Sequence, residues 1–465
     1  MNKRILQVGV ILSLLHLPSQ LPAQERNQPP KPLFDPASYG AKGDGVSYDT
    51  VAIQKAIDAC AGTKGSVVLK PGRYVSAQLT LREGMTFHLD KGAVLQGGTN
   101  AVDYPVLLPP ENRSSPNTRS LIYANKADNL TIEGPGEIDG RCRLVGMSGK
   151  EPERPSLIRI FNSTNVVVRD VTLRNPKMWT QVYWGITGLV LDHVTVDAPP
   201  ICPNLDGMDI CDSTNVVVRN CLVRSEDDSI CLKCGKPGLS NITVENNRIH
   251  SYGANAIKLG TASGGPVTHL VITNNVIDYA KFGGLCIESV DGAAVRDVTV
   301  RDLRMSHVAQ PVFIRLANRG PDPKTLASKP GKHRATHEPG SIDGVLIEEL
   351  HAVSGHARTA PSCSITGIPG ARVRNVTLRN CSFEMPGGQT KGAIPPEQEW
   401  GYPQSSIVGN TPAYGLFVRH ADGIILENVT FGFLKADSRP WIFTSDSTVS
   451  TNGCKSIGLV TAPKK

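Results

Sequence analysis

Asn165-Val166-Val167-Val168 and Asn215-Val216-Val217-Val218 are two copies of a phrase that returns along the chain. Three more copies begin with Asn and three related runs do not: Asn129-Leu130-Thr131-Ile132, Asn241-Ile242-Thr243-Val244, Asn375-Val376-Thr377-Leu378, Gly188-Leu189-Val190-Leu191, His269-Leu270-Val271-Ile272 and Gly423-Ile424-Ile425-Leu426. Most neighbouring copies lie about 23 to 28 residues apart, a period typical of stacked repeats. The alternation within each phrase predicts strands with one buried face.

A coil of this length cannot bury its apolar face alone, so the coils must stack on one another. Asn tolerates left-handed backbone at each turn, and its amide can hydrogen-bond to the Asn of the next coil. The expected fold class is therefore all-β: a single-domain, right-handed parallel β-helix of about ten coils. Leucine-rich repeats are the rival architecture, but their Leu spacing is absent.

The part of the chain that precedes the repeats predicts two features: a signal peptide and a short helix. Residues 1–23 resemble a secretory signal peptide, with a basic start, an apolar run and a small residue at Ala23. The apolar run is too short to span a bilayer. We therefore expect residues 24–465 to be exported, to the medium or the periplasm, as a soluble monomer with no membrane attachment. Asp49 and Thr50 can cap a short N-terminal helix whose apolar face is Ile53, Ile57 and Cys60.

Two proline-rich stretches, at about residues 318–341 and 386–412, interrupt the strand pattern. We expect long loops there, and long loops on a solenoid usually shape its binding face.

Charge and cysteine content narrow the class of partner. The net charge of +7 suits an acidic glycan, although it also suits ordinary solubility. No compact Lys/Arg block with interleaved aromatic residues is present, so nucleic acid is disfavoured. The 11 cysteines are odd in number, so at least one thiol is unpaired. Cys231 and Cys234 form one isolated CxxC, which favours buried thiols or a local disulfide over zinc, and no metal or cofactor is expected.

The candidate chemistry lies in Asn204-Leu205-Asp206-Gly207-Met208-Asp209 and Ser225-Glu226-Asp227-Asp228-Ser229. Asp206 and Asp227 are about one coil apart, so we expect them in register at the strand spacing of about 4.8 Å. Three carboxyls would then reach one sugar. Glycoside hydrolysis needs one protonated carboxyl for the leaving oxygen and a second carboxylate for water or for direct attack. A Ca²⁺ site and plain Asp turns are the alternatives.

The same motifs resemble those of glycoside hydrolase family 28, the polygalacturonase and rhamnogalacturonan hydrolase family. Its Asn-Thr-Asp-Gly and Gly-Asp-Asp motifs match Asn204-Leu205-Asp206-Gly207 and Glu226-Asp227-Asp228. Tyr39-Gly40-Ala41-Lys42-Gly43-Asp44-Gly45 resembles the family's N-terminal signature, and Tyr414-Gly415-Leu416-Phe417-Val418-Arg419-His420 resembles a late segment of bacterial members.

The resemblance implies a pectin-lyase-like β-helix that hydrolyses an acidic plant cell-wall polysaccharide or oligosaccharide of the galacturonan or rhamnogalacturonan type, with inversion. It implies that Asp227 is the general acid and that Asp206 and Asp228 position and deprotonate the water. Asn204 and Asn255 join the expected substrate-binding residues.

The sequence departs from the family pattern in the next two coils. Asn255 replaces the His of a usual Gly-His-Gly, and an amide cannot titrate. Cys286-Ile287-Glu288 replaces a usual Arg-Ile-Lys. If Ile257, Leu285 and Val312 are equivalent positions, Lys258 lies one coil before Cys286 and Arg315 one coil after Glu288.

We therefore expect Lys258 and Arg315 to contact the substrate acid, unless a neighbouring sugar such as rhamnose replaces it. A surface ion pair between Glu288 and Arg315 is the competing interpretation. Trp179, near Tyr183 and Trp184, is either a platform for a sugar ring or part of the core.

Two other functions remain open at this point. A lyase or epimerase on the same scaffold would need a base at the uronate C5 and a group that neutralises the uronate charge. A non-catalytic glycan-binding β-helix is the second, because several usual partners of the carboxylates are replaced.

Overall fold

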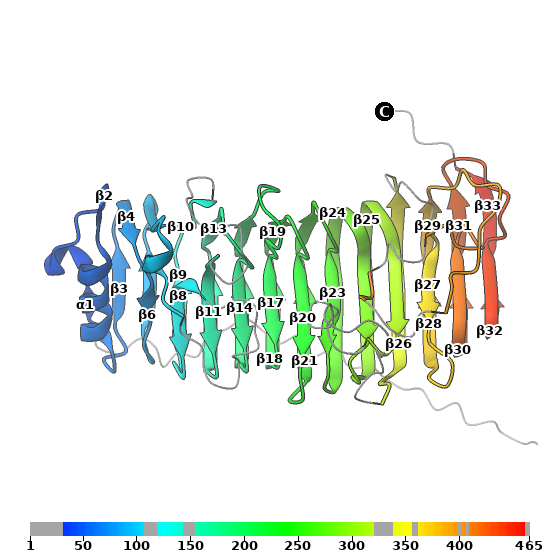
Figure 1. Cartoon of the computed structure of the whole chain (residues 1–465), viewed down its shortest axis with the longest axis horizontal. Coiled ribbons are helices and arrows are strands. Elements are labelled where there is room, and N and C mark those ends of the chain that lie inside the picture. The colour runs from blue at the N-terminus through cyan, green and yellow to red at the C-terminus, as the bar shows by residue number, and fades with distance from the viewer. Residues whose placement is uncertain are drawn as a thin grey trace, which may run out of the picture. The chain divides into compact units, whose positions relative to one another are not determined.

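The computed structural model describes residues 31–106, 119–142, 154–319, 338–355, 361–397, 402–404 and 409–460. From Pro32 onward the described chain forms one compact unit. Its 33 described strands join in one continuous sheet that winds coil after coil along the molecule (Figure 1). The expected all-β parallel β-helix is confirmed. The expected signal peptide, residues 1–23, lies outside the described residues.

Each coil supplies strands to three columns of parallel pairs, called here columns A, B and C. Column A begins with β1 (Leu33–Phe34), β3 (Ser66–Leu69), β6 (Thr86–Leu89), β9 (Leu130–Glu133), β12 (Thr164–Arg169), β15 (Thr187–Asp192), β18 (Thr214–Arg219) and β21 (Leu239–Glu245). Column B begins with β2 (Asp44–Tyr48), β4 (Gly72–Ser76), β7 (Ala93–Gly97), β10 (Glu137–Asp139), β13 (Thr172–Arg174), β16 (Thr195–Asp197), β19 (Leu222–Ser225) and β22 (Arg248–Ser251).

Column C begins with β5 (Leu79–Thr80), β8 (Ser120–Asn125), β11 (Ser156–Phe161), β14 (Gln181–Trp184), β17 (Met208–Cys211), β20 (Ile230–Cys234) and β23 (Ile257–Ser263). Longer strands then run through the corners and serve more than one column: β24 (Val267–Ser289), β25 (Ala294–Leu316), β26 (Ser341–Ser354), β30 (Leu416–Glu427) and β32 (Ile442–Asn452). The short strands among them are β27 (Cys363–Thr366), β28 (Val373–Arg379), β29 (Ser382–Met385), β31 (Thr430–Phe433) and β33 (Lys455–Leu459).

The stack is longer than the Asn phrase predicts. Within the described residues, column A runs through fourteen strands: β1, β3, β6, β9, β12, β15, β18, β21, β24, β25, β26, β28, β30 and β32. The sequence suggested about ten coils because the phrase is absent from the first strands and from β32.

The Asn residues at the turns have the predicted left-handed backbone and the predicted hydrogen bonds between coils. Asn165 and Asn215 both have φ of 57°, in the left-handed region. The Asn165 amide donates to Oδ1 of Asn129 at 3.1 Å, and the Asn241 amide donates to Oδ1 of Asn215 at 3.0 Å. Each turn is therefore bonded to the turn below it.

The N-terminal end is closed by α1 (Thr50–Cys60), which buries Ile53, Ile57 and Cys60 as expected. Asp49 precedes the helix, but its carboxylate accepts from the backbone N of Lys42 at 2.7 Å and so makes no side-chain cap. The capping prediction is wrong in that detail, because the glycine-rich turn before α1 competes for the same oxygens.

Two 3₁₀ turns, η2 (Pro36–Tyr39) and η3 (Ala101–Asp103), complete the helical elements of the described residues. No described helix has the length and apolar character needed to cross a membrane. Residues 386–397, 402–404 and 409–412 contain no helix or strand, in keeping with the loop expected there. Most of the other expected loop, residues 320–337, lies outside the described residues.

A second Asn ladder is buried inside the column A to column B turns. Oδ1 of Asn275 accepts from both the backbone N and the side-chain amide of Asn247, at 2.9 and 3.0 Å. Oδ1 of Asn247 in turn accepts from the backbone N of Cys221 at 2.9 Å. The ladder thus satisfies buried donors that have no water to bond to.

Asn275→Ala is expected to lower the free energy of unfolding by about 2–3 kcal/mol, because the Asn247 donors lose their buried acceptor. Urea unfolding measures the loss. Asn274→Gly is the matched control, since Asn274 is exposed, has positive φ, and bonds only on the outer ladder. Its expected loss is below about 1 kcal/mol, and equal losses in the two variants would contradict the role of the buried ladder.

Candidate active site

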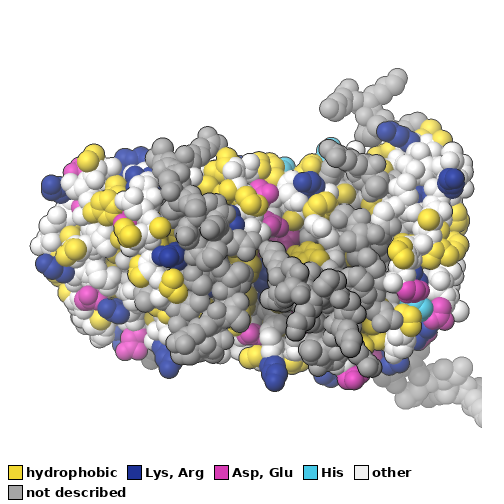
Figure 2. All heavy atoms as spheres, in the orientation of Figure 1, with side chains coloured by type: hydrophobic (Ala, Val, Ile, Leu, Met, Phe, Trp, Pro, Cys, Tyr) yellow, Lys and Arg dark blue, Asp and Glu magenta, His cyan; other side chains and the backbone are white. Residues whose placement is uncertain are grey.

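The candidate site lies where the chain leaves column B and enters column C, at the starts of β17, β20 and β23. Asp206, Asp228 and Asn255 each stand two residues before the paired positions Met208, Ile230 and Ile257. They therefore form one column of their own, a coil apart. Asp and Glu side chains gather near the middle of the face shown in Figure 2.

One detail of the expected register is wrong. Asp206 stands in register with Asp228, not with Asp227, because Met208 pairs with Ile230. Asp227 lies one position earlier, on the turn, where its backbone N donates to the carbonyl of Leu205 at 3.4 Å. A shift of one residue reverses the side on which a strand side chain points, so Asp227 and Asp228 approach the site differently.

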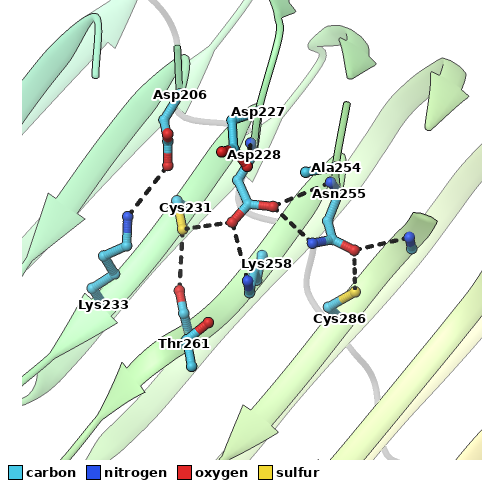
Figure 3. Close-up of polar contacts among 12 residues, drawn as sticks. Asp206, Asp227, Asp228, Cys231, Lys233, Ala254, Asn255, Lys258, Thr261 and Cys286 are labelled. Atoms are coloured by element: carbon cyan, nitrogen blue, oxygen red, sulfur yellow. Dashed lines mark hydrogen bonds and ion pairs between the residues drawn. The ribbon is translucent and has the colours of Figure 1, made fainter. Parts of the chain in front are cut away.

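Asp228 is the most heavily bonded of the three carboxylates (Figure 3). Its Oδ1 accepts from the Asn255 amide at 2.7 Å and from the Asn255 backbone N at 3.1 Å. Its Oδ2 faces the Lys258 ammonium at 3.1 Å, and Lys258 is only 1% exposed. Burial pushes the pKa of Asp228 upward, but Lys258, Lys233 and the Asn255 amide outweigh it and leave that pKa below its usual value.

Asp206 shares Lys233 with Asp209. The Lys233 ammonium lies 3.5 Å from Oδ2 of Asp206 and is paired directly with Oδ1 of Asp209. Its Nζ also stands 3.9 Å from the centre of the Trp179 ring. Burial, and then the charges of Asp209 and Asp227, raise the pKa of Asp206 well above its usual range. Its Oδ1 is buried with no hydrogen-bond partner in the described structure.

Asp227 has no described lysine or arginine within ion-pair distance. Its Oδ1 accepts from the Asp228 backbone N at 2.9 Å, and the Asn204 amide lies 3.5 Å from its Oδ2. Burial, with the charges of Asp228 and Glu226, raises the pKa of Asp227 to about 7. Asp227 can therefore hold a proton at a pH where Asp228 has lost one.

The charges in this cluster balance only if two protons stay bound. Asp206, Asp209, Asp227 and Asp228 face two ammonium groups. Asp209 and Asp228 pair with those groups, although burial still raises the pKa of Asp209 to about 6. Asp206 and Asp227 have no such direct partner, and burial and like charges raise their pKa values. An acid and an ionised carboxylate in adjacent positions are the pair that acid–base chemistry needs.

The family model "Glycosyl hydrolases family 28" matches residues 63–330. The chain belongs to glycoside hydrolase family 28. An exo-poly-alpha-D-galacturonosidase of Dickeya chrysanthemi is 24% identical, over 89% of this chain and 73% of that protein. An endo-polygalacturonase of Pectobacterium carotovorum subsp. carotovorum is 26% identical, over 58% of this chain and 72% of that protein.

Among solved structures, a family 28 exopolygalacturonase of Yersinia enterocolitica has a TM-score of 0.69 and 19% identity, covering 94% of this chain and 79% of that one. An exopolygalacturonase of Thermotoga maritima has a TM-score of 0.64 and 19% identity, over 77% and 88%. Both likenesses concern the fold. Membership of the family makes this chain a glycoside hydrolase.

The expected substrate-binding residues of this family 28 hydrolase differ from one another in their burial and in the groups that they contact. The amide of Asn255 and the ammonium of Lys258 are directed at Asp228. Trp179 is half-buried, with one ring face turned to Lys233. Asn204 is half-buried beside Asp227. Arg315 is buried, and its guanidinium donates to Oγ1 of Thr366 at 3.3 Å.

The register inferred for the next coils is confirmed, but the surface ion pair is not. Lys258 pairs with Cys286 and Glu288 with Arg315. Glu288, however, is 1% exposed, and its Oε2 has no hydrogen-bond partner among the described residues. Burial raises the pKa of Glu288 to about 8, so this carboxyl is a buried neutral group and not a surface charge.

Sequence reasoning missed Asp209, Lys233 and Arg154. Asp209 lies between the inward-facing Met208 and Ile210, so its outward position was visible in the alternation. Pairing β17 with β20 puts it one coil from Cys231 and near Lys233. Applying the register to every outward residue, beyond the motif residues alone, would have found this pair.

Asp206, Asp228 and Cys231 offer ligand atoms within 4.8 Å of one another, which is the geometry of a possible metal site. Lys233 and Lys258 already contact these carboxylates. The chain itself therefore supplies the positive charge that a bound cation would bring. Cys231 and Cys234 are both buried free thiols, one of the two outcomes expected for the CxxC.

Proposed function

We propose that this family 28 hydrolase cleaves glycosidic bonds in pectin-class polysaccharide or oligosaccharide, of the galacturonan or rhamnogalacturonan type. The observation that carries the proposal is the contrast between two adjacent buried carboxyls. Asp228 is bonded to Lys258 and Asn255, whereas Asp227 has no described cation within ion-pair distance, and burial raises the pKa of Asp227 to about 7. The named activities of the Dickeya and Pectobacterium relatives support the substrate class. We also propose that the protein is exported, because residues 1–23 have the composition of a signal peptide.

In the proposed mechanism Asp227 donates its proton to the leaving glycosidic oxygen. Asp206 and Asp228 hold the attacking water, since carboxyl oxygens of the two lie within 4.8 Å of each other and one water can bridge that distance. Asp228, kept ionised by Lys258 and Asn255, takes the proton from this water. Attack from the face opposite the leaving group inverts the anomeric centre.

Buried cationic groups flank the carboxylates along column C. Arg159 lies on β11, before the acidic positions, and Arg315 and Arg419 lie on β25 and β30, after them. We propose that these guanidinium groups attract the uronate carboxylates of the substrate on either side of the acidic positions, because opposite charges attract strongly where water is partly excluded. In this proposal the main work of Lys258 is to keep Asp228 ionised.

An assay on homogalacturonan, rhamnogalacturonan and their oligomers tests the proposal. The expected products carry new reducing ends without the ultraviolet absorbance of an unsaturated uronate, and proton NMR detects the inverted anomer first. An unsaturated product would instead establish a lyase. Binding without turnover on every substrate would establish a glycan-binding protein.

Arg154 is expected to act through Asn204. One guanidinium nitrogen donates to Oδ1 of Asn204 at 2.9 Å, which turns the Asn204 amide toward Oδ2 of Asp227. Arg154→Ala should therefore lower kcat by about 10- to 100-fold, because the general acid loses its orientation.

Steady-state kinetics of Arg154→Ala across the pH range measure this effect. The pH limb assigned to Asp227 should move as kcat falls, while KM changes little. Arg154→Lys should recover only part of kcat, since an ammonium cannot reproduce the guanidinium fork. A variant with unchanged kcat and pH profile would show that Asn204 needs no such support.

A further inference from the structure

Cys142 and Cys202 lie side by side although they are distant in sequence. Cys142 follows β10, and Cys202 lies in the loop between β16 and β17 that also carries Asn204. Their Sγ atoms are 3.2 Å apart. Both side chains are half-buried, so a small reagent can reach them. The other nine thiols of the chain, all in described residues, have no Sγ–Sγ contact.

Two buried cationic residues, Arg154 and Lys177, lie near enough to this thiol pair to act on it electrostatically. Arg154 donates to the carbonyl oxygens of Lys177 and Pro203, which brackets the Cys202 turn. Sγ of Cys202 lies 3.9 Å from the Lys177 carbonyl oxygen. The Lys177 ammonium is buried with no hydrogen-bond partner among the described residues. Positive charge beside a thiol favours its reactive thiolate form.

The electrostatics agree with the geometry. The hydrogen bond from Cys142 lowers the pKa of Cys202 to about 7; burial opposes that shift and the Arg154 guanidinium adds to it. The same hydrogen bond, with burial, raises the pKa of the Cys142 thiol. Cys202 is therefore the more readily ionised thiol of the pair, and it stands beside a second thiol that can complete an exchange.

We propose that Cys142 and Cys202 form an intramolecular disulfide in an oxidising compartment. The Cys202 thiolate attacks a low-molecular-weight disulfide such as oxidised glutathione, forms a mixed disulfide and releases one glutathione thiolate. The Cys142 sulfur, after losing its proton, then attacks the Cys202 sulfur and releases the second glutathione. The two protein thiols together lose two electrons and two protons, and the reagent disulfide is reduced to two thiols.

The bond would tie the loop before Asn204 to the segment that follows β10, which lies earlier in the stack. That loop sets the position of the Asn204 amide beside Asp227. A cross-link of two segments 60 residues apart also constrains the unfolded chain, so the oxidised protein should unfold at a higher temperature than the reduced protein.

Peptide mapping tests the proposal. The purified full chain is incubated with oxidised glutathione, alkylated and digested without reductant. The expected result is a linked pair of peptides containing Cys142 and Cys202, lighter than their sum by two hydrogens and separated by reductant. Recovery of both cysteines in alkylated form after this oxidation would overturn the proposal, as would a link from Cys202 to any other cysteine.

Thermal unfolding gives a second, independent result. The difference in Tm between oxidised and reduced protein should vanish in both Cys142→Ser and Cys202→Ser. It should persist in Cys454→Ser, which removes a half-buried thiol near the C-terminal end of the stack. Loss of the difference in Cys454→Ser alone would assign the stabilisation to another bond and reject the pair.

Discussion

Asp227→Asn is expected to lower kcat by about 10³-fold or more on whichever pectic substrate the enzyme accepts, because an amide cannot protonate the leaving oxygen. In the wild type, kcat should fall as pH rises through about 7, where Asp227 loses its proton. Reducing-end assays of both proteins across the pH range measure the two effects. Glu226→Gln is the control on the neighbouring carboxylate. At acidic pH its kcat should stay within a few-fold of the wild type, while the fall near pH 7 should move to lower pH because the Glu226 charge helps to raise the pKa of Asp227.

Asp227→Asn lowers kcat but should raise the stability of the folded protein above neutral pH. The pKa of Asp227 is raised in the folded state, so this carboxyl favours folding while it is protonated, and that contribution is lost as pH rises from about 4 to about 7. At pH 8 the Asp227→Asn protein should therefore have a higher Tm than the wild type. A lower Tm at pH 8, or wild-type kcat, would contradict the assignment of Asp227 as a buried acid.

Lys258→Met is expected to lower the free energy of unfolding by about 3–5 kcal/mol, because it leaves the Asp228 carboxylate buried without its counter-ion. Urea unfolding measures the loss, and Lys236→Met, at an exposed lysine, is the control. Combining Lys258→Met with Asp228→Asn should recover most of the lost stability, since the unpaired charge is then removed. If the two losses simply add, the pair does not interact as its geometry indicates.

Lys258→Met should also shift the pH dependence of kcat. Lys258 lowers the pKa of Asp228 and of Asp227, so its removal raises both. The acidic limb, on which Asp228 must ionise, moves to higher pH. If Lys258 served only to bind the substrate acid, KM would rise and the pH limbs would keep their positions.

The fold could be predicted from the sequence because its determinants are local and repeated. Each copy of the Asn phrase carries the alternation that sets a strand and the turn residue that ends the preceding one. The three catalytic candidates followed from their motifs. Their register was off by one residue, because Asp227 and Asp228 are adjacent and coil length alone cannot choose between them.

The surroundings of the site were harder to predict, for a different physical reason. Alternation separates the inside of a coil from its outside, but it does not tell whether an outward side chain is exposed. Along column C, four outward side chains are buried: Asp209, Lys258, Glu288 and Arg315. Charged residues in such positions act on each other at short range, so their pairing decides which of them can meet a substrate.

The parallel stacking of coils determines how far local unfolding at one end can spread along the molecule. Each strand is hydrogen-bonded only to the coils directly before and after it, so opening of the exposed strands β32 and β33 removes no bond from β17, β20 or β23. The carboxylates lie several coils from either end. Local unfolding at the ends of the stack therefore leaves the hydrogen bonds around the carboxylates in place.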